Sequence, residues 1–239
     1  MSHQLIDNLQ RILPAGASIL VTDSDGCLLT IRRHCVQTLD SERDNDLLPF
    51  IDQGHVARYL IGSAATSDRN PTNATYKLGV VAAHRGFTPH AHGAEHFVFS
   101  TGYAACGLYD AERDDIVTVP LTPGMMLHIP AMMPHTFNNR AGTPLLLLIA
   151  NTGMGLDHED YAITAAQAEV RARHAHDHHH HHNHHEHEQS VDFAQLAAVL
   201  RRMEQTLPQM QAHYRLNWGE RLAMRLRWLA TQLERGATE

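Results

Sequence analysis

The sequence has 239 residues, 43% of them hydrophobic, and 26 acidic against 19 basic side chains give a formal net charge of -7. A chain of this size and apolar content can bury a core in one or two domains. The acidic balance argues against a broad nucleic-acid surface, because phosphate binding needs clustered Lys and Arg. The 21 histidines are unusual, and ten of them fall between His174 and His187.

The cysteines and the apolar runs indicate the compartment. Cys27, Cys35 and Cys106 form no CxxC pair, and an odd number of cysteines predicts reduced thiols rather than a disulfide framework. The first residues carry no apolar run of signal-peptide length, and no stretch of the chain reaches a membrane-spanning length. We therefore expect a cytoplasmic protein with no membrane contact.

The first region, residues 1–70, is predicted to be an extension that packs on the domain after it. Apolar residues at helical spacing predict a short amphipathic helix that ends near Pro14. Residues 18–32 then contain two apolar runs on either side of Asp-Ser-Asp-Gly, which is typical of two strands joined by a tight turn.

The second region, residues 71–155, is dense in predicted strands. The segments are short, rich in β-branched and aromatic residues, and separated by turns that contain Gly, Pro or Asp. Eight strands without an intervening helix favour a closed barrel or a two-sheet jelly roll. The predicted strands are residues 75–84, 87–92, 96–101, 103–110, 115–121, 125–131, 135–140 and 144–151.

The third region, residues 156–189, is predicted to be a helix followed by a histidine-rich linker. The histidine run has no apolar periodicity, so it predicts extended chain rather than a packed element. It offers loose sites for Ni, Zn, Cu or Co, with storage or delivery of metal as one role and a polar linker of incidental affinity as an equal alternative. Representative ligands of this second kind are His178, His180, His182 and His184.

The fourth region, residues 190–239, is predicted to be helical. Its last helix begins at Asn217, which with Glu220 three residues later has the pattern of a capping box. A leucine stripe follows, and arginines flank it. Such a basic amphipathic helix suits a membrane surface, but packing against the strand domain or a second copy of the chain is the commoner use. The stripe consists of Leu222, Leu226, Leu229 and Leu233.

A group of metal-ligand residues lies on the predicted strands. His90 and His92 are two positions apart, so both imidazoles point to one face of a strand. Neutral imidazole is the usual protein ligand for Fe, Zn, Ni, Cu and Mn. Glu95 lies close in sequence, and His135 lies on a later strand after a bend between two prolines. Together they predict a metal site inside the strand domain.

These residues resemble the two sequence motifs of the cupin superfamily. The second motif, G-x5-P-x-G-x2-H-x3-N, is matched by Gly124, Pro130, His135 and Asn139, with Met132 at the internal glycine. The first motif, G-x5-H-x-H-x3–4-E-x6-G, is matched in type by His90, His92, Glu95 and Gly102. Here only two residues separate His92 from Glu95, and His84 takes the opening glycine position, with Gly86 nearby. The resemblance covers residues 74–152, about a third of the chain.

The resemblance implies a fold and a cofactor. The fold class is mainly β, a cupin-type jelly-roll β-barrel with an N-terminal extension and C-terminal helices. The implied cofactor is one divalent metal ion, held by His90, His92, Glu95 and His135. It also implies a homodimer, because many cupins pair through their barrels, and Asn139 is expected to support the backbone of the second motif.

The pocket beside this site depends on strand register. If Glu95 points to the metal, alternation turns His96 away and brings Phe97 and Phe99 inward. Met126 and Met132 are expected to line the same apolar pocket, and His128 to lie near it as a hydrogen-bonded strand histidine. Cys106 follows on the next strand, and alternation alone does not say whether it faces the metal.

The function expected from these residues is a metal-dependent cupin enzyme acting on a small organic substrate. The apolar pocket favours a non-heme Fe(II) oxygenase or dioxygenase that uses O2, with Glu95 as a general base. Arg85 and Arg140 are the only cations near the motifs, so sugar-phosphate chemistry is less favoured. One alternative is a Zn-, Ni- or Mn-dependent isomerase, cyclase or lyase. Another is a non-enzymatic cupin that binds metal or senses a ligand.

Overall fold

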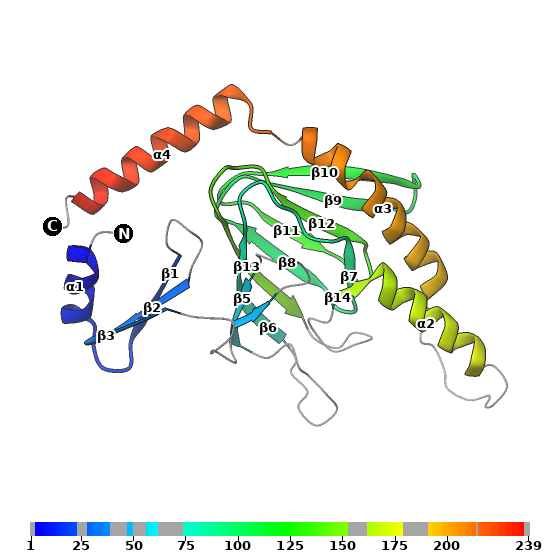
Figure 1. Ribbon diagram of the computed structural model, residues 1–239, viewed down its shortest axis with the longest axis horizontal. Coiled ribbons are helices and arrows are strands. Elements are labelled where there is room, and N and C mark those ends of the chain that lie inside the picture. Colours follow the sequence, from blue (N-terminus) through cyan, green and yellow to red (C-terminus); the bar gives the residue numbers. More distant parts are fainter. Residues whose placement is uncertain are drawn as a thin grey trace.

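Two antiparallel sheets that face each other form the main body of the protein (Figure 1). The computed structural model describes residues 3–22, 28–38, 47–49, 56–61, 74–152, 162–178, 191–213 and 215–236. Two helices, α2 and α3, run along one side of the sheets, and a small three-stranded sheet lies on the opposite side with α1 (Figure 1).

The eight strands predicted between residues 71 and 155 are all present. Each observed strand lies within its predicted segment or extends one residue beyond it, because the short apolar runs and their Gly and Pro turns mark both ends. The strands are β6 (Ala74–Val81), β7 (His90–His92), β8 (His96–Ser100), β9 (Ala104–Asp110), β10 (Asp115–Leu121), β11 (Met126–Ile129), β12 (His135–Asn139) and β13 (Leu145–Thr152).

The order of these strands is that of a jelly roll. One sheet contains β11-β8-β13-β6 and the other contains β10-β9-β12-β7. In chain order, the first, third, sixth and eighth strands of the set share one sheet, and the second, fourth, fifth and seventh share the other. The connections therefore cross repeatedly between the sheets, which is the jelly-roll pattern. The predicted fold class, mainly β with a jelly roll and C-terminal helices, is confirmed.

Strands from outside residues 71–155 extend both sheets. β4 (Leu47–Pro49) and β5 (Val56–Ile61) continue the first sheet beyond β6, and β14 (Ala162–Thr164) continues the second beyond β7. These strands were not predicted, because each is short and its pairing depends on a neighbour distant in sequence.

The N-terminal elements follow the prediction in part. The helix α1 (His3–Ile12) and the hairpin of β1 (Ser18–Thr22) and β2 (Leu28–Arg32) are present as expected. A third strand, β3 (Cys35–Thr38), pairs with β2 and was not predicted. All four of its residues are exposed, so it carries none of the apolar alternation that marks a half-buried strand.

The core lies between the two sheets and is made of alternate residues of each strand. In β13, for example, Leu145, Leu147 and Ile149 face inward and are at most 3% exposed. This arrangement follows from the period of two in a strand, which gives each sheet one inward face. The inward apolar residues are Val81, Phe87, Val98, Ala104, Cys106, Leu121, Ile129, Phe137, Leu145, Leu147 and Ile149.

The C-terminal part contains three helices: α2 (Ala165–His178), α3 (Phe193–His213) and α4 (Trp218–Gly236). α2 and α3 pack as a pair over Ala91 of β7 and Ile163 of β14. Asp192 caps α3, since its Oδ1 accepts hydrogen bonds from the amides of Ala194 and Gln195, each 3.0 Å long. None of the described helices is long and apolar enough to cross a membrane.

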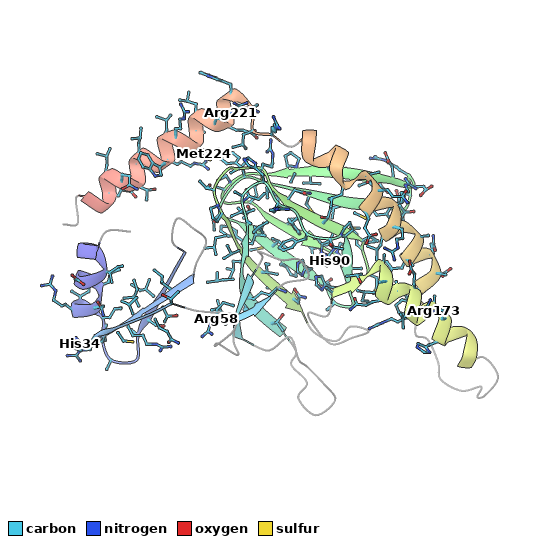
Figure 2. All side chains as sticks on the ribbon, in the orientation of Figure 1. His34, Arg58, His90, Arg173, Arg221 and Met224 are labelled. Carbon is cyan, nitrogen blue, oxygen red and sulfur yellow. The ribbon has the colours of Figure 1, made fainter. Side chains whose placement is uncertain are left out.

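The helix α4 contacts the jelly roll with the face opposite its leucine stripe. Met224, which lies on α4 (Figure 2), packs with Tyr103 and Ala141. Glu220 receives two hydrogen bonds of 2.8 and 2.9 Å from Arg140. The predicted capping box is confirmed by reciprocal 2.9 Å bonds between Asn217 and Glu220. The leucine stripe is exposed instead, by 41% at Leu222 and more at its other three positions.

Asn139 binds backbone groups, as expected, but these groups lie at the ends of strands outside the second motif. Its Nδ2 donates to the carbonyl oxygens of Val81, Ala82 and Thr143 over 2.8–3.2 Å, and its Oδ1 accepts the amide of Ala141 at 2.9 Å. The Asn139 side chain is 4% exposed, so water cannot replace these bonds.

Replacing Asn139 with Ala is expected to lower the free energy of unfolding by about 2–4 kcal/mol, because buried carbonyl and amide groups would lose their partners. Chemical denaturation measures the change. Asn217→Ala is the comparison, since it removes only an exposed helix cap that contributes about 1 kcal/mol. A loss at Asn139 no larger than that at Asn217 would contradict this structural role.

Candidate metal centre

Three buried histidines converge between the two sheets. His90 and His92 lie on β7, and His135 begins β12, which pairs with β7 so that His135 stands opposite His90. Each of the three is at most 2% exposed, and one ring nitrogen of each lies within 4.8 Å of the others. Figure 2 shows His90 between the sheets. The structure therefore brings together three of the four residues predicted as ligands, in a group that could hold a metal ion.

Hydrogen bonds fix the direction of two of these rings. Nδ1 of His90 lies 2.7 Å from the carbonyl oxygen of Thr88, and Nδ1 of His135 lies 2.9 Å from that of Met133. A carbonyl only accepts, so each Nδ1 carries the proton and each Nε2 keeps its lone pair. These backbone carbonyls orient the two rings in the way that is usual for metal-binding histidines, whose other ring nitrogen donates a hydrogen bond.

Several ring nitrogens of the group are buried without a hydrogen-bond partner. They are Nε2 of His135 and both nitrogens of His92. A buried polar atom that lacks a partner costs about 1–3 kcal/mol, so native structures leave few of them. A divalent metal ion fits this donor set, because neutral imidazole nitrogens are common ligands of transition metals.

Burial favours the neutral form of His92 and His135. It is the main cause that lowers the pKa of His92 and His135 well below the usual value of histidine. The neighbouring imidazoles lower both values further, and so does Lys77 on β6. Neutral rings are the form that binds metal, so protons compete weakly for this site near neutral pH.

Glu95 does not join the group. Its side chain is 54% exposed, and its Oε1 lies 3.6 Å from Nε2 of His128, which is also on the outer surface. The predicted inward register of β8 is therefore wrong: His96, Val98 and Ser100 face inward. Only two residues separate His92 from Glu95, and a shift of one residue in a strand turns every side chain to the opposite face.

His96 occupies the place that the sequence analysis gave to Glu95. Its ring stacks on that of His92 with centroids 4.4 Å apart and lies 5.3 Å from the ring of His135. Nδ1 of His96 is 2.5 Å from Oδ1 of Asn151. In the cupin pattern, three residues between the second histidine and the glutamate would put the glutamate at position 96. The signal that identifies His96 was therefore present in the motif spacing.

The residues predicted to line a pocket lie elsewhere. Phe97 is half-buried on the outer face of its sheet, where its ring stacks on His128 at 4.6 Å. Phe99 shares that face by alternation, and Met126 is 62% exposed. Phe87 and Phe137 are the aromatic residues that meet the histidines, with ring centroids 6.4 Å from His90 and 6.0 Å from His135.

Met132 faces the helices rather than the metal centre. It packs against the group formed by Ala91, Ile163 and α3, and it borders a surface groove of about 360 Å³ along that helix. Its φ of 62° lies in the left-handed region that favours glycine. The motif has glycine at this position, and also at His84, whose φ is 55°. The backbone therefore keeps the shape of the motif where the glycines themselves are missing.

Cys106 faces the core but does not belong to the histidine group. It is fully buried, and its neighbour across the strand pair is Phe137. Burial raises the pKa of the Cys106 thiol well above its usual value, so the thiolate that binds metal is disfavoured. Cys35 and Cys106 are free cysteines, in line with the predicted reduced thiols.

The histidine-rich run is only partly described. His178 is the last residue of α2, and residues 179–190 lie outside the described residues, including His180, His182 and His184. Loose metal binding by this run stays a prediction.

Replacing Glu95 with Ala is expected to leave metal affinity within about twofold of the original value, because the carboxylate lies outside the histidine group. Replacing His96 with Ala is expected to weaken binding by about tenfold or more, since even groups that only pack on and orient the metal ligands commonly contribute that much. Competition with a chromophoric chelator measures both. A larger loss at Glu95 than at His96 would contradict the observed register.

Comparisons with known proteins find similarity only to solved structures, and no protein-family model and no curated protein matches the sequence. A conserved protein of unknown function from Streptococcus pyogenes is 14% identical over 48% of this chain and 86% of that chain, with a TM-score of 0.33. Oxalate decarboxylase from Lactobacillus farciminis, in a formate complex, is 16% identical over 58% of this chain and 40% of that chain, with a TM-score of 0.41.

A further similar structure is the 7S globulin of Momordica charantia, 18% identical over 45% of this chain and 32% of that chain, with a TM-score of 0.37. The chain thus spans less than half the length of the decarboxylase and of the globulin. At these identities and TM-scores, the chemistry has to be argued from the residues of the site itself.

Proposed function

We propose that the protein is a metal-dependent enzyme of the cupin superfamily that acts on a small organic substrate. The observation that carries the proposal is the buried group of His90, His92 and His135, in which both ring nitrogens of His92 and Nε2 of His135 have no hydrogen-bond partner. The jelly-roll strand order and the glycine-like backbone at two motif positions support the superfamily.

The residues around the group support chemistry in a dry site. Phe87 and Phe137 are each 2% exposed and cover two of the histidines with apolar surface. Such surroundings exclude bulk water and strengthen electrostatic interactions with a bound substrate. His90, His92 and His135 would hold the ion, with His96 as the fourth nitrogen donor in the place that the motif gives to glutamate.

A divalent ion in this site would supply open coordination positions. It would also keep its full double positive charge, because neutral imidazoles do not neutralise it. We favour Fe(II) and an oxygenase reaction, in which O2 and the substrate share the open positions. The second candidate is Lewis-acid chemistry with Zn, Ni or Mn, as in an isomerase, cyclase or lyase. Glu95 is not the general base in either case, because it lies at the outer surface.

Oxygen uptake separates the two candidates. The protein is freed of metal, loaded with Fe(II), Zn or Mn, and mixed with pools of small aromatic and carboxylic compounds in an oxygen-electrode cell, with products followed by mass spectrometry. An oxygenase consumes O2 only with Fe(II) and a substrate, and His135→Ala removes the uptake. Substrate conversion with Zn or Mn and no O2 uptake would replace the oxygenase with the Lewis-acid candidate. Tight metal binding without any conversion would argue for a non-enzymatic role.

A further inference from the structure

A small pocket lies where α4 meets the strand turns at one end of the jelly roll. It has a volume of about 200 Å³, and none of the buried histidines lines it. One side is formed by the turns that connect β8 to β9 and β12 to β13, and the other by Met224 and Arg227 of α4. The volume is below the range of about 300–1,000 Å³ that is typical of drug-sized ligands, so the pocket suits a small molecule.

Arg227 brings the only charge to the described lining of this pocket. Its guanidinium lies over the ring of Tyr103, with Cζ 5.9 Å from the ring centroid, which is the geometry of a cation–π contact. No carboxylate lines the pocket, and the guanidinium has no ion pair or hydrogen bond with any described residue. Arg140 nearby differs, since Glu220 binds it at 2.8 Å. Arg227 therefore presents an unpaired positive charge, positioned by an aromatic ring.

Tyr103 offers a second hydrogen-bond donor. Its side chain lines the pocket, is 5% exposed, and packs with Ala141, Leu216 and Met224. The hydroxyl has no hydrogen-bond partner among the described residues. Tyrosines that are largely buried usually bond through this group. A ligand oxygen in the pocket would supply the partner.

Much of the remaining lining is apolar and comes from the strand turns and β13. It includes Pro123, Pro144, Leu145 and Leu146. An inorganic anion would leave this carbon surface uncovered, whereas an organic acid would remove it from water. A guanidinium forms strong charge-assisted hydrogen bonds with a carboxylate. The lining therefore matches a carboxylate that carries a short apolar body.

We propose that this pocket binds a small organic carboxylate, with the carboxylate group on Arg227 and Tyr103 and the apolar body against the prolines and leucines. The site does not depend on the metal centre or on the enzyme function proposed above. The two sides of the pocket belong to α4 and to the strand turns, so the bound acid joins them. Binding therefore stabilises the docking of α4 on the jelly roll. No bond is made or broken in this step.

Benzoate binding to the 239-residue chain tests the site, with benzamide as the uncharged analogue of similar shape. Titration calorimetry is expected to show one benzoate per chain and binding of benzamide that is weaker by about tenfold or more, because the bonds to the guanidinium lose their charge. Inorganic phosphate should bind more weakly than benzoate, since it has no apolar body. No binding of benzoate, equal binding of benzamide, or tighter binding of phosphate would overturn the proposal.

Three variants locate the binding. Arg227→Gln should weaken benzoate binding by about tenfold or more, and Tyr103→Phe, which keeps the ring, by about threefold or more. Arg225→Gln is the matched control, because Arg225 is exposed on the same helix and does not line the pocket. It should bind benzoate as tightly as the original protein. Unchanged binding in Arg227→Gln or in Tyr103→Phe, or an equal loss in Arg225→Gln, would contradict the site.

Hydrogen exchange separates this site from the metal centre, where a bound ion could also attract a carboxylate. Benzoate is expected to slow amide exchange in α4 of the original protein and of His135→Ala, because the helix then opens less often. It should not do so in Arg227→Gln. Protection of α4 that disappears in His135→Ala but persists in Arg227→Gln would place benzoate at the metal centre and overturn the proposal.

Discussion

Metal-free protein is expected to lose about 4 kcal/mol of unfolding free energy between pH 7.5 and pH 5.5. Burial lowers the pKa of His92, His96 and His135 in the folded state, whereas in the unfolded chain each regains a pKa of about 6.5. At a pH below about 6.5, the unfolded chain therefore binds more protons at these histidines than the folded protein does. Stability is therefore full above the unfolded pKa and falls as the pH decreases, by about 1.4 kcal/mol per pH unit for each such histidine.

Urea denaturation at several pH values measures this slope, and two variants isolate its source. His96→Gln is expected to remove about a third of the slope, because one of the three contributing imidazoles is gone. His128→Gln is the matched control, since the His128 side chain is 45% exposed on the same sheet and should leave the slope unchanged. A stability that does not change over this pH range would contradict the burial of neutral histidines.

Metal binding is expected to produce the second large effect, and it should depend on His135. At a free metal concentration about 1000 times the dissociation constant, binding to the folded state alone raises the unfolding free energy by about 4 kcal/mol. His135→Ala removes a ligand from the opposite strand, so this stabilisation should disappear. Thermal unfolding with and without zinc measures both proteins.

This comparison needs a protein without the histidine run, because its ten histidines between His174 and His187 can also bind zinc. A background in which these ten residues are replaced by serine keeps the length of the chain. In that background, equal stabilisation of the original protein and of His135→Ala by zinc would place the metal elsewhere.

Much of the fold was predictable because its signals are local. The eight strands of the jelly roll were read from short apolar runs and their turns, and the pairing of His90 with His92 follows from strand alternation. The two motifs also predicted that His135 lies close to His90 and His92. This contact joins β7 and β12, which are distant in sequence, so it could not be read from local signals.

The part of the site that was not predicted depends on parity and on long-range pairing. The two-residue corner after His92 decides whether Glu95 or His96 faces inward, and a sequence pattern alone does not give the number of residues that a corner consumes. The same error in the strand register led to the wrong prediction that Phe97, Phe99 and Met126 line the pocket.

Lys77 was overlooked for a related reason. It lies before the first motif, and only the pairing of β6 with β13 shows that its side chain points between the sheets. Its residue type argued for exposure, since lysine is rarely buried. Residue 77 shares one face of β6 with the buried Thr75 and Gly79, because residues two apart in a strand point the same way.

The central claim is that His90, His92 and His135 form one metal site, and metal content per chain tests it most directly. The serine-substituted background is loaded with zinc, passed through a desalting column and measured by elemental analysis, with and without His135→Ala. The account predicts one zinc per chain in the background and none after the additional change. One zinc per chain in both proteins, or none in either, would contradict it.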